Sequence, residues 1–220
     1  MCRRVHERTG KVEDLGRSHR QPISTIPGRK FAVANDFSTV VSSQDNVATL
    51  YNAKASPSGT MFTTTSKIET LALSSKSSRV AAGLADGTVW LWDSGNAELI
   101  ERLDGYKGRG YGSRLQFSRT GTRIAYSSPI GINLRDGTSG KFITDLRYGQ
   151  SDEFKFSADG SRIAYRLHDG ITNLLLWNSK SGKFIGAGWN VGLSGHHALA
   201  ISANGSLLAT TCRDKVFIFL

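Results

Sequence analysis

The sequence predicts an all-β protein built from repeated four-stranded antiparallel sheets. Three observations lead to this fold class. The 220 residues contain 24 Gly but only 4 Pro, and 39% are hydrophobic, a composition that suits a globular chain with many tight turns. Apolar and polar residues alternate in short runs, which is the period of strands rather than of helices. The whole pattern also recurs about every 42 residues.

The repeat begins with two apolar residues that flank one other residue, followed by a turn and a second apolar strand. Its anchor residues lie 40, 44, 39 and 45 positions apart in sequence. They are Val33, Leu73, Phe117, Phe156 and Ile201. Five matches in one register are too many for chance, so five structural repeats are expected.

Each repeat continues with further strands in a constant order. A polar turn precedes a third strand, expected at 47–51, 89–92, 132–135, 174–177 and 216–219. A Ser/Thr-Gly turn then leads to a fourth strand, expected at 99–103, 142–146 and 184–186. Short loops between these strands make each unit an antiparallel meander.

A single four-stranded sheet leaves both of its faces uncovered. Placing such sheets side by side around an axis buries both faces, and the resulting architecture is a β-propeller. A β-sandwich or barrel would also be all-β, but neither repeats at this interval. We therefore expect a β-propeller of four-stranded antiparallel blades with five repeats, spanning residues 23–220.

The fifth repeat contains only three expected strands, which leaves the closure of the ring open to two interpretations. In the first, the β-prone residues 23–26 supply the missing outer strand by pairing with 216–219, so that the ring is complete with five blades. In the second, the five repeats are a fragment of a ring of six to eight blades, or pair with a partner chain.

The net charge of +10 is concentrated near the start of the chain. Residues 1–30 contain eight basic and three acidic residues, and no strand or helix period is evident before about residue 22. We expect residues 1–22 to form a flexible basic arm. The absence of a signal-peptide pattern, of a long apolar run and of a cysteine framework predicts a cytoplasmic or nuclear protein without a membrane segment.

The second repeat carries a family resemblance. Residues 79–93, with Asp86-Gly87 in a turn and Trp92-Asp93 at the end of the third strand, resemble a Trp-Asp (WD) repeat. The resemblance covers about residues 23–220 in degenerate form, and 156–165 are also similar to TolB-like and prolyl-peptidase propellers. In WD terms, the turn between the second and third strands is braced by an Asp, which falls at Asp45, Asp86, Asp169 and Asp214. The third repeat departs from this pattern with Ile130.

No catalytic, metal-binding or cofactor-binding motif is found. Phosphate-loop, nucleophile-elbow and zinc-ligand spacings are all missing from the sequence. His196 and His197 are adjacent, so their side chains diverge on a strand or loop and lack a nearby third ligand. The turn Asp residues recur at one position of the repeat, which favours a structural role over a catalytic pair. We therefore expect no enzyme activity and no cofactor.

The expected binding surface is the rim where the loops between blades meet the turns between second and third strands. Tyr and Arg, the residue types that anchor interfaces, are combined in one Gly-rich loop of this rim. The candidate residues are Tyr106, Arg109, Tyr111 and Arg114 in that loop, Trp189, His196 and His197 in the loop 186–197, and Arg213.

The sequence thus favours a non-catalytic scaffold that binds other proteins through this rim. The alternative is a nucleic-acid-associated module that uses the basic arm, since phosphate contact needs only Lys and Arg side chains. A propeller enzyme is the least favoured of the three, because acidic residues fall mostly in turns. Partner identity and oligomeric state are not determined by the sequence.

Overall fold

The computed structural model describes the chain at residues 3–6, 11–14, 22–34, 38–52, 59–74, 78–104, 114–128, 131–147, 153–167, 173–190, 198–212 and 215–220. These residues form strands and turns, and every pair of neighbouring strands is antiparallel. Within them, no helix is long and apolar enough to cross a membrane. The predicted all-β class is confirmed.

Four sheets have four strands and follow chain order from one edge to the other. They are β4 (Lys30–Val33), β5 (Thr39–Gln44), β6 (Val47–Asn52) and β7 (Thr60–Thr63); β8 (Ile68–Ser74), β9 (Arg79–Leu84), β10 (Thr88–Asp93) and β11 (Leu99–Asp104); β12 (Leu115–Phe117), β13 (Arg123–Ser128), β14 (Gly131–Asp136) and β15 (Phe142–Arg147); β16 (Glu153–Phe156), β17 (Arg162–Arg166), β18 (Asn173–Asn178) and β19 (Lys183–Asn190).

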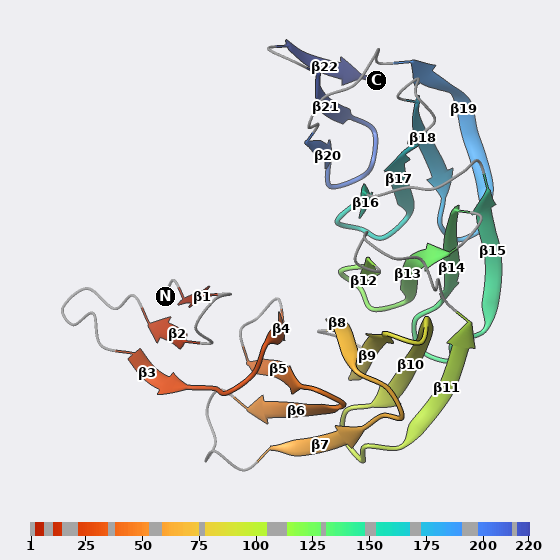
Figure 1. Ribbon diagram of the computed structural model, residues 1–220. Helices are drawn as coiled ribbons and strands as arrows, with labels where there is room; N and C mark the ends of the chain where they lie inside the picture. Colours follow the sequence, from red (N-terminus) through yellow and green to blue (C-terminus); the bar gives the residue numbers. More distant parts are fainter. Residues whose placement is uncertain are drawn as a thin grey trace.

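Two further sheets have three described strands each. One comprises β1 (Arg3–His6), β2 (Lys11–Asp14) and β3 (Pro22–Thr25), and the other comprises β20 (Leu199–Ile201), β21 (Leu208–Cys212) and β22 (Lys215–Phe219). The sheets lie side by side along an open arc (Figure 1). The first strands β8, β12, β16 and β20 line its inner side, and the fourth strands β7, β11, β15 and β19 line its outer side. This is an arrangement of the propeller type.

The core is distributed between consecutive sheets, as the alternation of apolar residues requires. Val89 and Leu91 of β10 belong to one buried cluster with Leu115 and Phe117 of β12. Three other clusters join the remaining consecutive pairs of sheets from β4–β7 to β20–β22 in the same way. Burying a side chain of this size stabilises the fold by about 1.5–3 kcal/mol. Each sheet is therefore held by its neighbours.

Glycine is needed where the first and second strands of a repeat are joined. In three sheets a Ser carbonyl accepts a hydrogen bond from a Gly amide three residues later, as Ser202 does from Gly205 at 3.0 Å. Gly205 has a φ of +72°, and a Cβ there would lie 2.6 Å from Cδ of Arg162 in the preceding sheet. Only glycine suits both the left-handed backbone and this close approach.

The structure corrects one expectation about the start of the chain and disfavours one of the two interpretations of ring closure. Residues 1–22 were expected to form a flexible arm, but β1 pairs with β2 inside this range and β2 pairs with β3. In one of the two open interpretations residues 23–26 clasp β22, but β3 pairs with β2 and lies at the opposite end of the arc from β20–β22 (Figure 1). A local meander closes short loops, whereas the clasp would join strands almost 200 residues apart.

Candidate functional site

Two kinds of loop meet at one end of the sheets. One kind connects each sheet to the next, and the other is the turn between the second and third strands of a sheet. The amide of Ile68 donates to the carbonyl of Asp45 at 2.8 Å, and the amide of Ala85 donates to the carbonyl of Lys67 at 2.8 Å. Ser127, at the end of β13, likewise donates from its amide to the carbonyl of Arg114 at 3.0 Å. Arg114 therefore lies at this loop end, as expected from the sequence.

A cleft of about 380 Å³ opens beside Arg114 on the inner side of the arc. The first strands of three consecutive sheets contribute its lining, which comprises Glu69, Thr70, Arg114, Leu115, Gln116, Phe154 and Lys155. Alternation along these strands explains the lining: Leu115 and Phe154 are turned into the core, while Gln116 and Lys155 are exposed. The side chains that the cleft offers to a ligand are therefore mainly polar.

A second cleft of about 380 Å³ lies along β12 and β16, two of the three strands that line the first cleft, towards the opposite end of the sheets. It shares Gln116 with the first cleft, and the rest of its lining is Phe117, Arg119, Phe156, Ser157 and Ala158. We call the two clefts together the inner groove. Its described lining holds three cationic side chains, Arg114, Arg119 and Lys155, and one carboxylate, Glu69.

The charges of the inner groove favour an anionic ligand. Glu69 forms an ion pair with Lys67 at 3.3 Å, and because the two side chains are 38% and 55% exposed, the pair contributes little to stability. Among the described residues, no ion pair involves Arg114, Arg119 or Lys155. Their charges are therefore available to a bound group, and a concave wall concentrates their field.

The turn Asp residues that lie in the described part of the chain make local contacts. Oδ1 of Asp86 accepts hydrogen bonds from the amide of Thr88 at 2.9 Å and from its Oγ1 at 2.7 Å. Asp45 adopts a φ of +51°, a conformation that Asp tolerates better than most residues. Asp169 and Asp214 lie outside the described residues. Asp86 thus holds the shape of its own turn.

The candidate rim residues do not all reach one site. Arg114 lines the inner groove, whereas Tyr106, Arg109, Tyr111, His196, His197 and Arg213 lie outside the described residues. Trp189 was expected in a loop but belongs to β19, which extends to Asn190. Its ring lies 5.4 Å from that of Phe219 in the next sheet, because an indole gains more from packing between sheets than from exposure.

Sequence reasoning missed a set of arginines that connect neighbouring sheets. Nε of Arg79 donates to the carbonyl of Thr138 at 3.1 Å, and Nε of Arg123 donates to the carbonyl of Ser179 at 2.9 Å. The guanidinium of Arg162 donates to the carbonyl of Gly205 at 2.9 Å. Each acceptor belongs to the following sheet. The signal was present in the sequence, since Arg occurs at the same position of three repeats.

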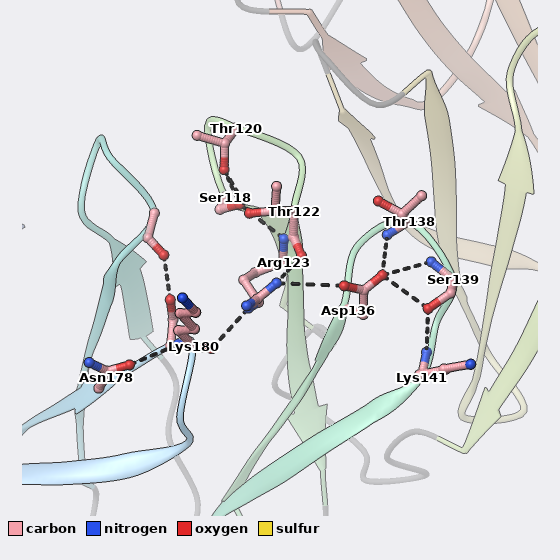
Figure 2. A network of polar contacts seen from close by, with 12 residues as sticks. Ser118, Thr120, Thr122, Arg123, Asp136, Thr138, Ser139, Lys141, Asn178 and Lys180 are labelled. Carbon is pink, nitrogen blue, oxygen red and sulfur yellow. Dashed lines mark hydrogen bonds and ion pairs between the residues drawn. The ribbon is translucent and has the colours of Figure 1, made fainter.

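Arg123 also contacts a carboxylate of its own sheet (Figure 2). Its guanidinium lies 3.6 Å from Oδ2 of Asp136, and Oδ1 of Asp136 accepts hydrogen bonds from the amides of Thr138 and Ser139. Partial burial opposes ionisation of Asp136, but the hydrogen bonds from Ser139 and Thr138 and the charge of Arg123 outweigh it and lower the pKa. Arg79 forms the equivalent ion pair with Asp93.

Metal-binding chemistry is not indicated in the described part of the chain. Within it, no three His, Cys, Asp or Glu side chains lie close enough together to hold a metal ion. The described lining of the inner groove contains one carboxylate, Glu69.

Comparison with known proteins identifies a similar fold and no family. No protein-family model matches the chain, and no curated protein matches it. Among solved structures, the chain is similar to Kuenenia stuttgartiensis hydrazine synthase with 14% identity and a TM-score of 0.60, over 82% of this chain and 54% of that one. It is also similar to the computationally designed Ika8 protein with 17% identity and a TM-score of 0.65, over 96% of this chain and 65% of that one.

These likenesses concern the fold alone, because sequence identity is so low. The chain spans about half the length of the hydrazine synthase chain and somewhat less than two thirds of the designed one. Both alignments agree with an all-β arrangement of the propeller type.

Proposed function

We propose that this protein is a non-catalytic scaffold of the WD-repeat type that binds other proteins. The observation that carries the proposal is the inner groove, two clefts that share Gln116 and whose lining from consecutive sheets holds three cationic side chains. Paired carboxylates, which a propeller glycosidase would need, are absent from the described lining of the clefts. Recognition by shape and charge requires no such pair.

The WD-type assignment and the five blades belong to the same proposal. The five repeats from Lys30 to Phe219 act as five blades, and the Trp92-Asp93 pair supports the WD type. Asp93 accepts a hydrogen bond from the amide of Gly95 at 2.8 Å and pairs with Arg79. Trp92 lies 5.5 Å from Phe62 of the preceding sheet. The dipeptide thus supports a turn and a junction between sheets.

The partner is an extended, acidic segment of another protein. Each cleft has the volume of a small ligand site, so a few consecutive side chains fill the pair. Carboxylates at alternate positions of such a segment share one side and face Arg114, Arg119 and Lys155. Complementary charge then provides specificity and fast association.

A defined peptide tests this proposal. Fluorescence anisotropy measures binding of a labelled peptide of alternating Glu and Val residues to the full chain. The double variant Arg114→Ala/Lys155→Ala should bind about tenfold more weakly, equal to about 1.4 kcal/mol, because two charged contacts are lost. The matched control Lys180→Ala/Lys183→Ala removes the same charge at exposed positions outside the inner groove and should change binding less than about twofold.

Equal weakening by both double variants would mean that only net charge matters, and it would contradict a site in the inner groove. A single-stranded RNA of the same charge serves as the competitor. If the RNA binds more tightly than the peptide and Arg114→Ala/Lys155→Ala abolishes that binding, the protein is instead a nucleic-acid-associated module.

A further inference from the structure

The turn that joins β20 to β21 contains the single Asn-Gly pair of the sequence, Asn204-Gly205. In such a pair the amide nitrogen of the glycine can attack the side-chain carbonyl of the asparagine, because glycine has no side chain to hinder the approach. Asn204 is exposed, so water, the other reactant, reaches it. The turn therefore holds an asparagine whose side-chain amide is open to spontaneous hydrolysis.

The reaction takes two steps. The amide nitrogen of Gly205 loses its proton and bonds to Cγ of Asn204, while the bond from Cγ to Nδ2 breaks and Nδ2 leaves with a proton as ammonia. Water then adds to Cγ of the five-membered ring and breaks the bond from Cγ to the ring nitrogen, which leaves an aspartate in an ordinary chain. Addition of water to the main-chain carbonyl of the ring gives an iso-aspartate linkage instead.

The folded turn opposes the first step. The amide of Gly205 donates to the carbonyl of Ser202 at 3.0 Å, and this hydrogen bond favours the form that keeps its proton. Oδ1 of Asn204 accepts hydrogen bonds from the amide of Ser206 at 3.0 Å and from its Oγ at 2.8 Å. These two bonds fix the orientation of the side-chain amide. Attack by Gly205 therefore requires the turn to open.

The preceding sheet holds the backbone on both sides of Asn204. The amide of Asp159 donates to the carbonyl of Ala203 at 2.9 Å, and the guanidinium of Arg162 donates to the carbonyl of Gly205 at 2.9 Å. Both donors belong to the sheet β16–β19 or to its first turn. The junction between β16–β19 and β20–β22 thus controls how often the turn opens.

The preceding repeat shows that the product of hydrolysis suits this turn. Asp159 stands at the position of Asn204, and its Oδ1 accepts hydrogen bonds from the amide of Ser161 at 2.9 Å and from its Oγ at 2.8 Å. Hydrogen bonds from Ser157 and Ser161 lower the pKa of Asp159, so these donors favour a carboxylate. An aspartate at position 204 would meet the same kinds of donor.

We propose that Asn204 is a modification site, where the side-chain amide is hydrolysed to a carboxylate at a rate set by opening of the junction between β16–β19 and β20–β22. The change adds one negative charge to the turn and keeps its hydrogen-bond acceptor in place. Because the reaction is irreversible, the modified fraction records how often this junction has opened.

Mass spectrometry of the peptide that contains Asn204 measures the modified fraction during incubation of the full chain at mildly alkaline pH. Unfolding in urea should accelerate the reaction at least about tenfold, because the turn is then open throughout. Arg162→Ala should accelerate it about fivefold in the folded protein, since one tie to the turn is lost. The matched control Arg123→Ala removes the equivalent arginine at another junction and should change the rate less than about twofold.

A second pair of variants tests the contacts within the turn. Ser206→Ala removes one donor to Oδ1 of Asn204 and should also accelerate the reaction, whereas Ser161→Ala makes the same change beside Asp159 and should not. Asn204→Asp should unfold at the same urea concentration as the wild type, because the turn accepts a carboxylate.

Three results would overturn the proposal. Equal rates in folded and urea-unfolded protein would show that the turn exerts no control. Equal rates in Arg162→Ala and Arg123→Ala would show that this junction has no particular effect. Absence of any modification in urea would show that Asn204 does not react at all.

Discussion

Tyr126 illustrates how one buried polar side chain is accommodated in the core between sheets. Its side chain is fully buried in the cluster that joins β8–β11 to β12–β15, and Nε of Arg135 donates to its hydroxyl oxygen at 3.0 Å. Burial raises the pKa of Tyr126 from 10.0 to about 12, although the nearby Arg135 acts in the opposite direction. The folded protein therefore holds the neutral phenol.

This shift predicts a loss of stability at high pH. Above pH 10 the unfolded chain ionises this tyrosine while the folded protein keeps it protonated, so stability falls from about pH 10 to about pH 12. The loss amounts to about 2–3 kcal/mol. Tyr126→Phe should remove this part of the pH dependence and cost about 1 kcal/mol at neutral pH, because the hydrogen bond from Arg135 is lost. Urea unfolding across this pH range provides the measurement.

The control for this experiment is Tyr51→Phe, which changes a half-buried tyrosine in another sheet and should retain the alkaline loss. An unchanged pH dependence in Tyr126→Phe would show that other groups cause the loss.

At the scale of elements, the repeats are joined by arginines as well as by apolar contacts. Arg123 donates to Ser179 of the next sheet and pairs with Asp136 of its own sheet, with its side chain only 17% exposed. One side chain thus ties two turns of adjacent sheets together (Figure 2). Sequence analysis found the turn positions but not this tie, because the partner of each arginine lies in another repeat.

Replacing this arginine should loosen one junction. Arg123→Ala should destabilise the protein by about 1–3 kcal/mol, since the carbonyl of buried Ser179 loses its donor and Asp136 loses its cation. The midpoint of urea unfolding provides the measurement. Arg119→Ala, an exposed arginine in the same turn, is the control and should stay within about 0.5 kcal/mol of wild type. Equal effects of the two substitutions would argue against a tie between sheets.

At the scale of the molecule, stability depends on how many neighbours each sheet has. Sheets β8–β11, β12–β15 and β16–β19 are covered by apolar clusters on both faces, whereas β20–β22 is covered on the face towards β16–β19 only. In repeat architectures, stability is approximately a sum of units and nearest-neighbour contacts. The terminal sheet therefore opens more readily than the central ones.

Hydrogen exchange should follow this gradient. At low protein concentration, the amides of β13 and β14 should exchange at least about tenfold more slowly than those of β21 and β22, because opening the terminal sheet breaks one junction instead of two. Mass spectrometry of peptides from each strand provides the measurement. Uniform protection across all sheets would mean that the chain opens only as one unit.

Much of the fold could be predicted because its information is local. Strands follow from the alternation of apolar residues, and turns follow from residues such as Gly205. The repeat follows from the recurring anchors Leu73, Phe117 and Phe156. Strands, turns and repeat all depend on neighbouring residues within one unit. The pairing of β3 with β2 was not anticipated, and pairing with β22 was one of two open interpretations, because the choice between a nearby and a distant partner is not encoded in the strand period.

The sequence by itself determined the all-β class, the four-stranded antiparallel unit and the positions of its turns. Only the tertiary structure decided which units face each other. It brought Arg114, Arg119 and Lys155 to one inner groove, gave Arg123 its acceptor in the next sheet, and left Val216 and Ile218 uncovered. The physical reason is that strand period and turn chemistry act over a few residues, whereas burial and charge clustering depend on which sheets become neighbours.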